Sequence, residues 1–146
     1  MKKLLLFAVI ALSTSAFAST EPVPDNVRKS FHAQHPAAAG VTWHEYDTYY
    51  VVNFQSNGIN CQLRYDLSGS VISLRRAYYE KDLSPFLVEK VRQSYPNKKI
   101  FGITEFTTGT GITYEIILED HKSWVHVRSD ANGEMVQFKK LRKARS

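Results

Sequence analysis

DNVRKSFHAQHPAAAGVTWHEYDTYYVVNF, residues 25–54, has a counterpart of the same pattern in PFLVEKVRQSYPNKKIFGITEFTTGTGITYEIIL, residues 85–118. Equivalent positions in the first part of the two stretches lie 60 residues apart. This spacing pairs Val27 with Leu87, Phe31 with Val91, His35 with Tyr95, Pro36 with Pro96 and Trp43 with Ile103. A repeat held in one register over this length predicts two copies of one small supersecondary unit.

The repeat continues beyond these stretches after an insertion of four residues in the glycine-bearing turn at residues 107–111. The spacing then becomes 64, which pairs Tyr50 with Tyr114, Asp66 with Asp130 and Gly69 with Gly133. We therefore expect a single duplicated domain over residues 19–138. Unit one covers about residues 22–80 and unit two about residues 83–141.

Each unit opens with a short helix that is apolar on one side. Asp25 is expected to cap the first helix, which ends before Pro36. Ser84 is expected to cap the second, with Pro85 in its first turn and Pro96 after its end. Both helices need a sheet to cover, because a short one-sided helix gains most of its stability from tertiary packing.

The rest of each unit alternates apolar and polar residues at the two-residue period of half-buried strands. Four antiparallel strands are predicted per unit, at residues 41–47, 49–55, 59–66 and 70–78 and at residues 100–106, 112–119, 122–129 and 134–141. The side chains expected to face the helices are Tyr50, Val52, Phe54, Cys61, Leu63, Ile72 and Leu74 in unit one, and Tyr114, Ile116, Leu118, Val125, Val127, Val136 and Phe138 in unit two. The prediction is an α+β fold of two tandem α-β4 units that form an antiparallel sheet, with both helices packed on one face.

The chain begins with a predicted secretory signal peptide at residues 1–18. Lys2 and Lys3 precede an apolar run that ends in the small-residue sequence at residues 16–18. The run is shorter than the roughly 20 residues that a transmembrane helix needs, so we expect no transmembrane anchor. The protein is therefore predicted to be exported to the periplasm or secreted.

Charge is unevenly distributed along the chain. The formal net charge is +5, but Lys2 and Lys3 contribute two of these charges and residues 139–146 contribute five basic residues, so residues 19–138 carry −2. Residues 139–146 are expected to form a basic C-terminal tail, of the kind that is usually solvated and frayed. Because the folded body is not basic, no nucleic-acid partner is expected.

The sequence contains no recognisable catalytic, cofactor or metal motif. Cys61 is the one cysteine and alternates with apolar residues, which predicts a buried thiol rather than a nucleophile. His32 and His35 are three residues apart on a helix, but no third ligand follows at a zinc-binding spacing. We expect no catalytic residues, no cofactor and no metal, with a periplasmic enzyme or metal-handling protein as an alternative.

The unit resembles the PepSY-like domain of secreted bacterial proteins, whose fold is similar to that of the β-lactamase inhibitor protein (BLIP). The matching features are Pro-x-x-Val-x-x-x-Phe at residues 24–31, Trp43, the aromatic strand at residues 49–54, and the Asp-x-x-Gly turn from Asp66 to Gly69. The resemblance covers about residues 22–141 and implies a fold rather than an activity. It also implies that the open sheet face could hold a protein, as it does in the inhibitor.

The open sheet face is the strongest functional candidate. Trp124, His126 and Arg128 alternate with the apolar Val125 and Val127, so they are predicted to lie on the face away from the helices. The partner-binding candidates are Trp124, His126, Arg128, Ile117, Arg64 and Gln62. An aromatic and an arginine beside exposed aliphatics is typical of interaction hot spots.

These candidates predict an exported, non-enzymatic module that binds a protein or peptide of the cell envelope. Trp124 could instead be covered by a loop or by the basic tail, and a purely structural envelope component is a further alternative. The sequence leaves the ligand and the oligomeric state open.

Overall fold

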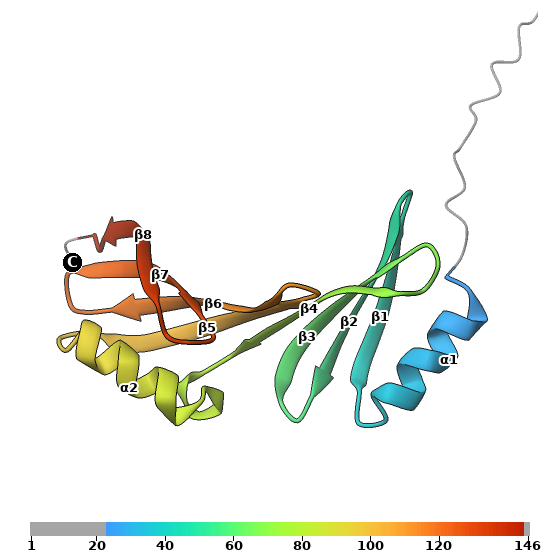
Figure 1. Cartoon of the computed structure of the whole chain (residues 1–146), viewed down its shortest axis with the longest axis horizontal. Helices are drawn as coiled ribbons and strands as arrows, with labels where there is room; N and C mark the ends of the chain where they lie inside the picture. The colour runs from blue at the N-terminus through green and yellow to red at the C-terminus, as the bar shows by residue number, and fades with distance from the viewer. Residues whose placement is uncertain (1–22, 145–146) are drawn as a thin grey trace, which may run out of the picture.

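A computed structural model of the chain describes residues 23–144, and the predicted signal peptide lies outside the described residues. The described part forms two α-helices, one 3-10 turn and eight strands (Figure 1). In chain order these are α1 (Asp25–Gln34), β1 (Ala39–Tyr46), β2 (Tyr49–Ser56), β3 (Ile59–Asp66), β4 (Val71–Tyr78), η1 (Glu80–Asp82), α2 (Pro85–Ser94), β5 (Lys99–Thr108), β6 (Gly111–Glu119), β7 (Ser123–Asp130) and β8 (Met135–Arg142).

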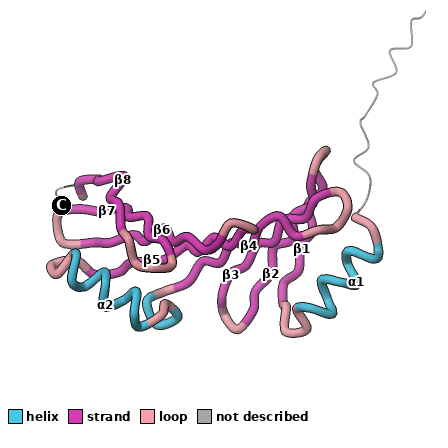
Figure 2. The backbone as a smooth tube through the Cα atoms, in the orientation of Figure 1, coloured by secondary structure: helices cyan, strands magenta, loops and turns pink. Residues whose placement is uncertain are grey.

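All eight strands belong to one antiparallel sheet, in which each strand pairs with its neighbours in sequence. Side chains directly opposite each other on adjacent strands share a face. Cys61 lies opposite Arg76, Arg76 opposite Glu105, and Glu105 opposite Tyr114. Cys61 belongs to the core under α1 and Tyr114 packs against the core under α2. Both helices therefore cover the same face (Figure 2), and we call the other face the open face.

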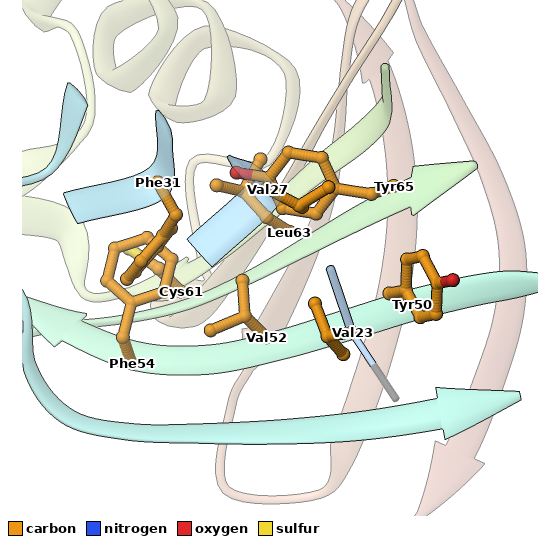
Figure 3. Packing of buried hydrophobic residues seen from close by; sticks show 9 residues of the cluster. All are labelled: Val23, Val27, Phe31, Tyr50, Val52, Phe54, Cys61, Leu63 and Tyr65. Atoms are coloured by element: carbon orange, nitrogen blue, oxygen red, sulfur yellow. The ribbon is translucent and has the colours of Figure 1, made fainter. Parts of the chain in front are cut away.

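The first core lies between α1 and strands β1–β3 (Figure 3). Val27 and Phe31 are one helical turn apart, and both are buried on the side of α1 that meets the sheet. Phe31 is wholly buried and meets Trp43 and Phe54 edge to face, at ring centroid distances of 5.5 and 5.0 Å. The buried members of this core are Val23, Val27, Phe31, Tyr50, Val52, Phe54, Cys61, Leu63 and Tyr65.

The second core repeats this arrangement under α2. Its buried members are Tyr78, Leu83, Leu87, Val91, Ile103, Ile116, Leu118, Val125 and Val127. The Ser84 hydroxyl accepts a hydrogen bond from the Leu87 backbone N–H at 3.3 Å, which confirms the predicted cap. The predicted Asp25 cap is wrong, because Pro24 occupies the N-cap and Asp25 is the first helical residue. At that position its carboxylate still favours the positive end of the helix dipole.

An Asp-x-x-Gly turn of the sheet lies close to each helix, at Gly69 near α1 and at Gly133 near α2. Asp66 accepts the backbone N–H of Ser70 at 2.9 Å and its carbonyl accepts that of Gly69 at 3.0 Å. Gly69 has φ +87°, and a Cβ at this position would lie 2.7 Å from a methyl of Val27 on α1. Glycine is required here both by the backbone conformation and by the close approach of the helix.

An ion pair between the buried Glu105 and the partly exposed Arg76 occupies the helix-covered face where the two cores meet. Arg76 donates three hydrogen bonds of 2.8–3.0 Å to the Glu105 carboxylate, and the Tyr78 hydroxyl donates a fourth at 2.7 Å. Burial and the hydrogen bond to Glu105 raise the pKa of Tyr78 above its usual range. Because Arg76 is on β4 and Glu105 on β5, the pair links the two halves of the sheet.

Three side chains predicted to pack under the helices are exposed instead. Ile72, Val136 and Phe138 are 43%, 67% and 46% exposed. The register places Val136 opposite Arg128, and Ile72 and Phe138 are the extra residues of two β-bulges. A bulge adds one residue to one strand and redirects the side chains around it.

The predicted basic tail also begins later than expected. Residues 139–142 form the second half of β8, which ends at Arg142. The backbone N–H of Lys143 then donates to the Lys122 carbonyl at 2.9 Å. Residues 139–142 are therefore ordered by pairing with β7, although their charge alone predicted a frayed end.

Candidate interaction face

Trp124, His126 and Arg128 lie on the open face, as their alternation with buried Val125 and Val127 predicts. Ile117 of β6 is directly opposite His126 and shares this face. The structure thus brings together four of the six partner-binding candidates. Their role in binding stays a prediction.

Two phenylalanines complete this group. Phe101 meets Trp124 edge to face at a centroid distance of 4.6 Å, and Phe138 meets His126 at 5.9 Å. Phe101 is 49% exposed and Phe138 is 46% exposed. We define the open-face cluster as Phe101, Ile117, Trp124, His126, Arg128 and Phe138.

Ion pairs hold two cations over the rings of the cluster. The Arg128 guanidinium bonds Glu115 at 2.9 Å and lies 5.1 Å from the Phe138 centroid. Lys143 bonds Glu119 at 2.8 Å, and its ammonium lies 4.2 Å from the Trp124 ring.

Cation and ring attract each other in this geometry, typically by about 0.5–1 kcal/mol at exposed sites. Trp124 is half-buried, and Lys143 lies over its ring. The alternative prediction, that the basic end of the chain covers Trp124, is therefore correct in part.

The two remaining candidates lie on the open face of β3 and do not reach the cluster. Gln62 donates to Asn53 at 2.9 Å, and the Arg64 guanidinium lies 4.4 Å from the Tyr49 ring. Four strand spacings separate β3 from β7, or about 19 Å at a typical spacing between strands. The first half of the open face is thus a separate, more polar surface.

A shallow hollow of about 270 Å³ adjoins the cluster. Its lining includes the small residues Ala77, Gly102 and Thr104 and two exposed rings, Phe101 and Tyr79. The hollow extends the apolar surface toward β4. The sequence did not single out Phe101 or Tyr79, because β-bulges and strand ends escape simple alternation.

Cys61 and the possible metal ligands were the residues on which catalysis or metal binding could have rested. Cys61 is buried, and burial raises the pKa of its thiol, which disfavours the thiolate needed for nucleophilic attack. Between residues 23 and 144, no three His, Cys, Asp or Glu side chains gather as a metal site would require. Neither described helix is long and apolar enough to cross a membrane.

One polar cluster resembles a serine and lysine pair but is a turn brace. Lys98 bonds both Asp120 and the Ser123 hydroxyl, the latter at 3.1 Å. Lys98 and the backbone of the turn lower the pKa of Asp120, so the carboxylate stays ionised beside the ammonium. A lysine paired in this way is poorly placed to act as a base for Ser123.

Comparison with known proteins identifies the fold. No protein-family model and no curated protein matches the sequence. A BLIP-like protein from Bacteroides fragilis matches with a TM-score of 0.65 and 16% identity, over 85% of this chain and 90% of that one. A DUF2874 family protein from Bacteroides ovatus matches with a TM-score of 0.62 and 20% identity, over 82% and 86%.

A third match is to a protein from Bacteroides eggerthii that is provisionally described as periplasmic. Its TM-score is 0.62 at 15% identity, over 82% of this chain and 88% of that one. The chain therefore has the BLIP-like fold that its sequence resemblance predicted.

Proposed function

We propose that this protein is an exported, non-enzymatic module that binds a protein or peptide through its open sheet face. The observation that carries the proposal is the open-face cluster, where Phe101 and Phe138 are exposed beside the half-buried Trp124. Aromatic residues with an arginine are enriched at the centres of protein interfaces. Exposed apolar groups gathered on one face usually mark an interaction site.

The ion pairs at the edge of the cluster support the same proposal. Glu115 orients Arg128 and Glu119 orients Lys143, so the cations and rings are already ordered before a partner arrives. Ordering side chains at an interface costs about 0.5–1.5 kcal/mol for each one immobilised. A cluster fixed in advance avoids part of that cost.

We further propose that the chain consists of two copies of one α-β4 unit, at about residues 22–80 and 83–141. At the spacing of 64, Trp124 corresponds to Asn60 and Ile117 to Asn53, and both asparagines lie on the open face. The same scaffold is thus compatible with a polar surface. This difference suggests that the apolar residues of unit two serve binding rather than folding.

The proposed site of action is the periplasm or the exterior of the cell. The proposal rests on the signal-peptide pattern at residues 1–18, which lies outside the described residues. The provisional periplasmic description of a protein with the same fold is consistent with it.

Photo-crosslinking from the open face tests the proposal. A photoreactive amino acid at Phe101 should capture one partner of defined mass from an envelope extract, whereas the same group at Lys29 of exposed α1 should not. The double variant Trp124→Asn with Ile117→Asn gives unit two the residues of unit one and should abolish capture, with a circular dichroism spectrum like that of the parent. Equal capture from both positions, or capture unaffected by the two substitutions, would contradict the proposal.

A further inference from the structure

The outermost strand β8 carries a second recognition feature beside the cluster. Within residues 23–144, β8 pairs with β7 alone and ends the sheet (Figure 1). Its other edge therefore presents backbone N–H and C=O groups that pair with no strand of this part of the chain. An edge of this kind can accept an added strand from another chain. Seven of the eight residues of β8 are exposed.

The open-face side of β8 is mainly apolar, with Lys139, opposite His126, as its one charged residue. Val136, Phe138 and Leu141 are 67%, 46% and 43% exposed. Leu141 lies opposite Trp124, so this apolar row continues the open-face cluster to the rim of the sheet.

The other side of β8 is basic. Lys140 lies opposite Val125 and Arg142 opposite Ser123, both of which face the helices. Neither Lys140 nor Arg142 forms an ion pair with any residue between 23 and 144. Their charges are therefore available to a partner.

Protection of the β8 edge against self-association explains its basic residues but not its exposed apolar residues. Lysines on an edge strand repel a second copy of the same strand and so limit aggregation. Protection does not explain three exposed apolar side chains on the same strand, since such residues favour association. Basic charge is concentrated on the helix-covered side, and Lys139 adds one cation to the apolar side. These two sides match a strand that is acidic on one side and apolar on the other.

We propose that β8 pairs with an extended segment of the partner in which apolar and acidic residues alternate. The apolar side chains of the partner segment lie beside Phe138 and Leu141, and its carboxylates lie beside Lys140 and Arg142. Alternation follows from the pleat, because successive residues of a strand point to opposite faces. This inference rests on the proposed function and specifies the chemistry of the partner.

A synthetic eight-residue peptide of alternating valine and glutamate tests the pairing. With the mature protein it should bind saturably, bind more weakly at high salt, and slow hydrogen exchange at β8 amides. The same peptide methylated on every backbone nitrogen keeps its charge but cannot donate to the edge, so it should not protect β8. Lys140→Glu should weaken peptide binding about tenfold, whereas the matched Lys29→Glu on α1 should not.

Three outcomes would overturn the pairing. One is equal binding of the methylated peptide, which would indicate charge attraction alone. The second is the absence of β8 protection up to about 1 mM peptide, beyond which binding is too weak to be specific. The third is protection of β8 that rises with protein concentration without peptide, which would identify a second copy as the occupant. Crosslinking from Phe101 separates the two proposals, because it would persist if only the edge pairing is wrong.

Discussion

The ion pair at the centre of the sheet should be far more sensitive to loss of Arg76 than to loss of Glu105. The Glu105 side chain is 6% exposed, and Arg76 supplies three of its four hydrogen bonds. The Arg76 side chain is 39% exposed and can reach water if its partner is removed. The two single substitutions therefore leave very different groups without a partner.

The structure gives a magnitude for each variant. Arg76→Met leaves a buried carboxylate with only the Tyr78 hydroxyl, and breaking a buried pair in this way costs about 3–5 kcal/mol of unfolding free energy. Glu105→Leu leaves no buried charge, but Tyr78 loses its acceptor, at about 1–3 kcal/mol. The double variant Arg76→Met with Glu105→Leu should resemble Glu105→Leu, so it should be more stable than Arg76→Met alone.

Urea unfolding of the three variants and the parent measures these differences, provided that the m-value stays constant. Arg64→Met is a suitable control, because Arg64 is exposed on the open face and forms no ion pair within residues 23–144. A loss below about 1 kcal/mol in Arg76→Met would refute the reasoning, since surface ion pairs contribute at most that much. A double variant less stable than Arg76→Met would refute it equally.

Three further outcomes are expected. Trp124→Ala should lower the free energy of unfolding by about 1–2 kcal/mol, because it removes one ring contact and one cation–ring contact. Val125→Ala should lower it by about 2 kcal/mol, because it removes a buried side chain. Thermal denaturation that shows a loss of more than about 3 kcal/mol for the tryptophan variant and none for the valine variant would mean that the two faces are inverted. Gly69→Ala should destabilise the protein more than Gly58→Ala in chemical denaturation, because both glycines have positive φ but only the Cβ at Gly69 meets α1; equal losses would argue against the contact. Cys61 should react with a thiol reagent at the unfolded rate only in denaturant, since burial raises the pKa of its thiol and blocks access; fast labelling of the native protein would contradict its placement.

The elements of this fold were readable from the sequence because its local patterns agree. The predicted strand at residues 59–66 coincides with β3, and the prolines after both helices mark where each ends. Two-residue alternation placed Trp124 and Val125 on opposite faces correctly. Where periodicity, turn residues and helix caps all indicate the same element, a single sequence is enough to predict that element.

The errors concentrate at β-bulges. Phe138 is the extra residue where β8 shifts register against β7, and Phe101 lies in the equivalent shift of β5 against β6. Alternation alone would put Phe101 on the side of Ile103, which is buried under α2. A bulge depends on pairing between strands, so it leaves no mark in the alternation of either strand.

The pairing of Arg76 with Glu105 was also beyond the sequence. The two residues are 29 positions apart and meet only because β4 pairs with β5. Nothing in the local sequence of either strand specifies that contact, or the burial of Glu105 that follows from it. Long-range register decides both.

The bulges and the proposed duplication bear on the same question, namely whether the open-face cluster is needed for folding. Bulges turn Phe101 and Phe138 away from the cores, where burying them would have stabilised the fold. Asn53 and Asn60 show that the same face can be polar in the other half of the sheet. Because an exposed apolar surface favours aggregation, the proposed partner would explain why this cluster is retained.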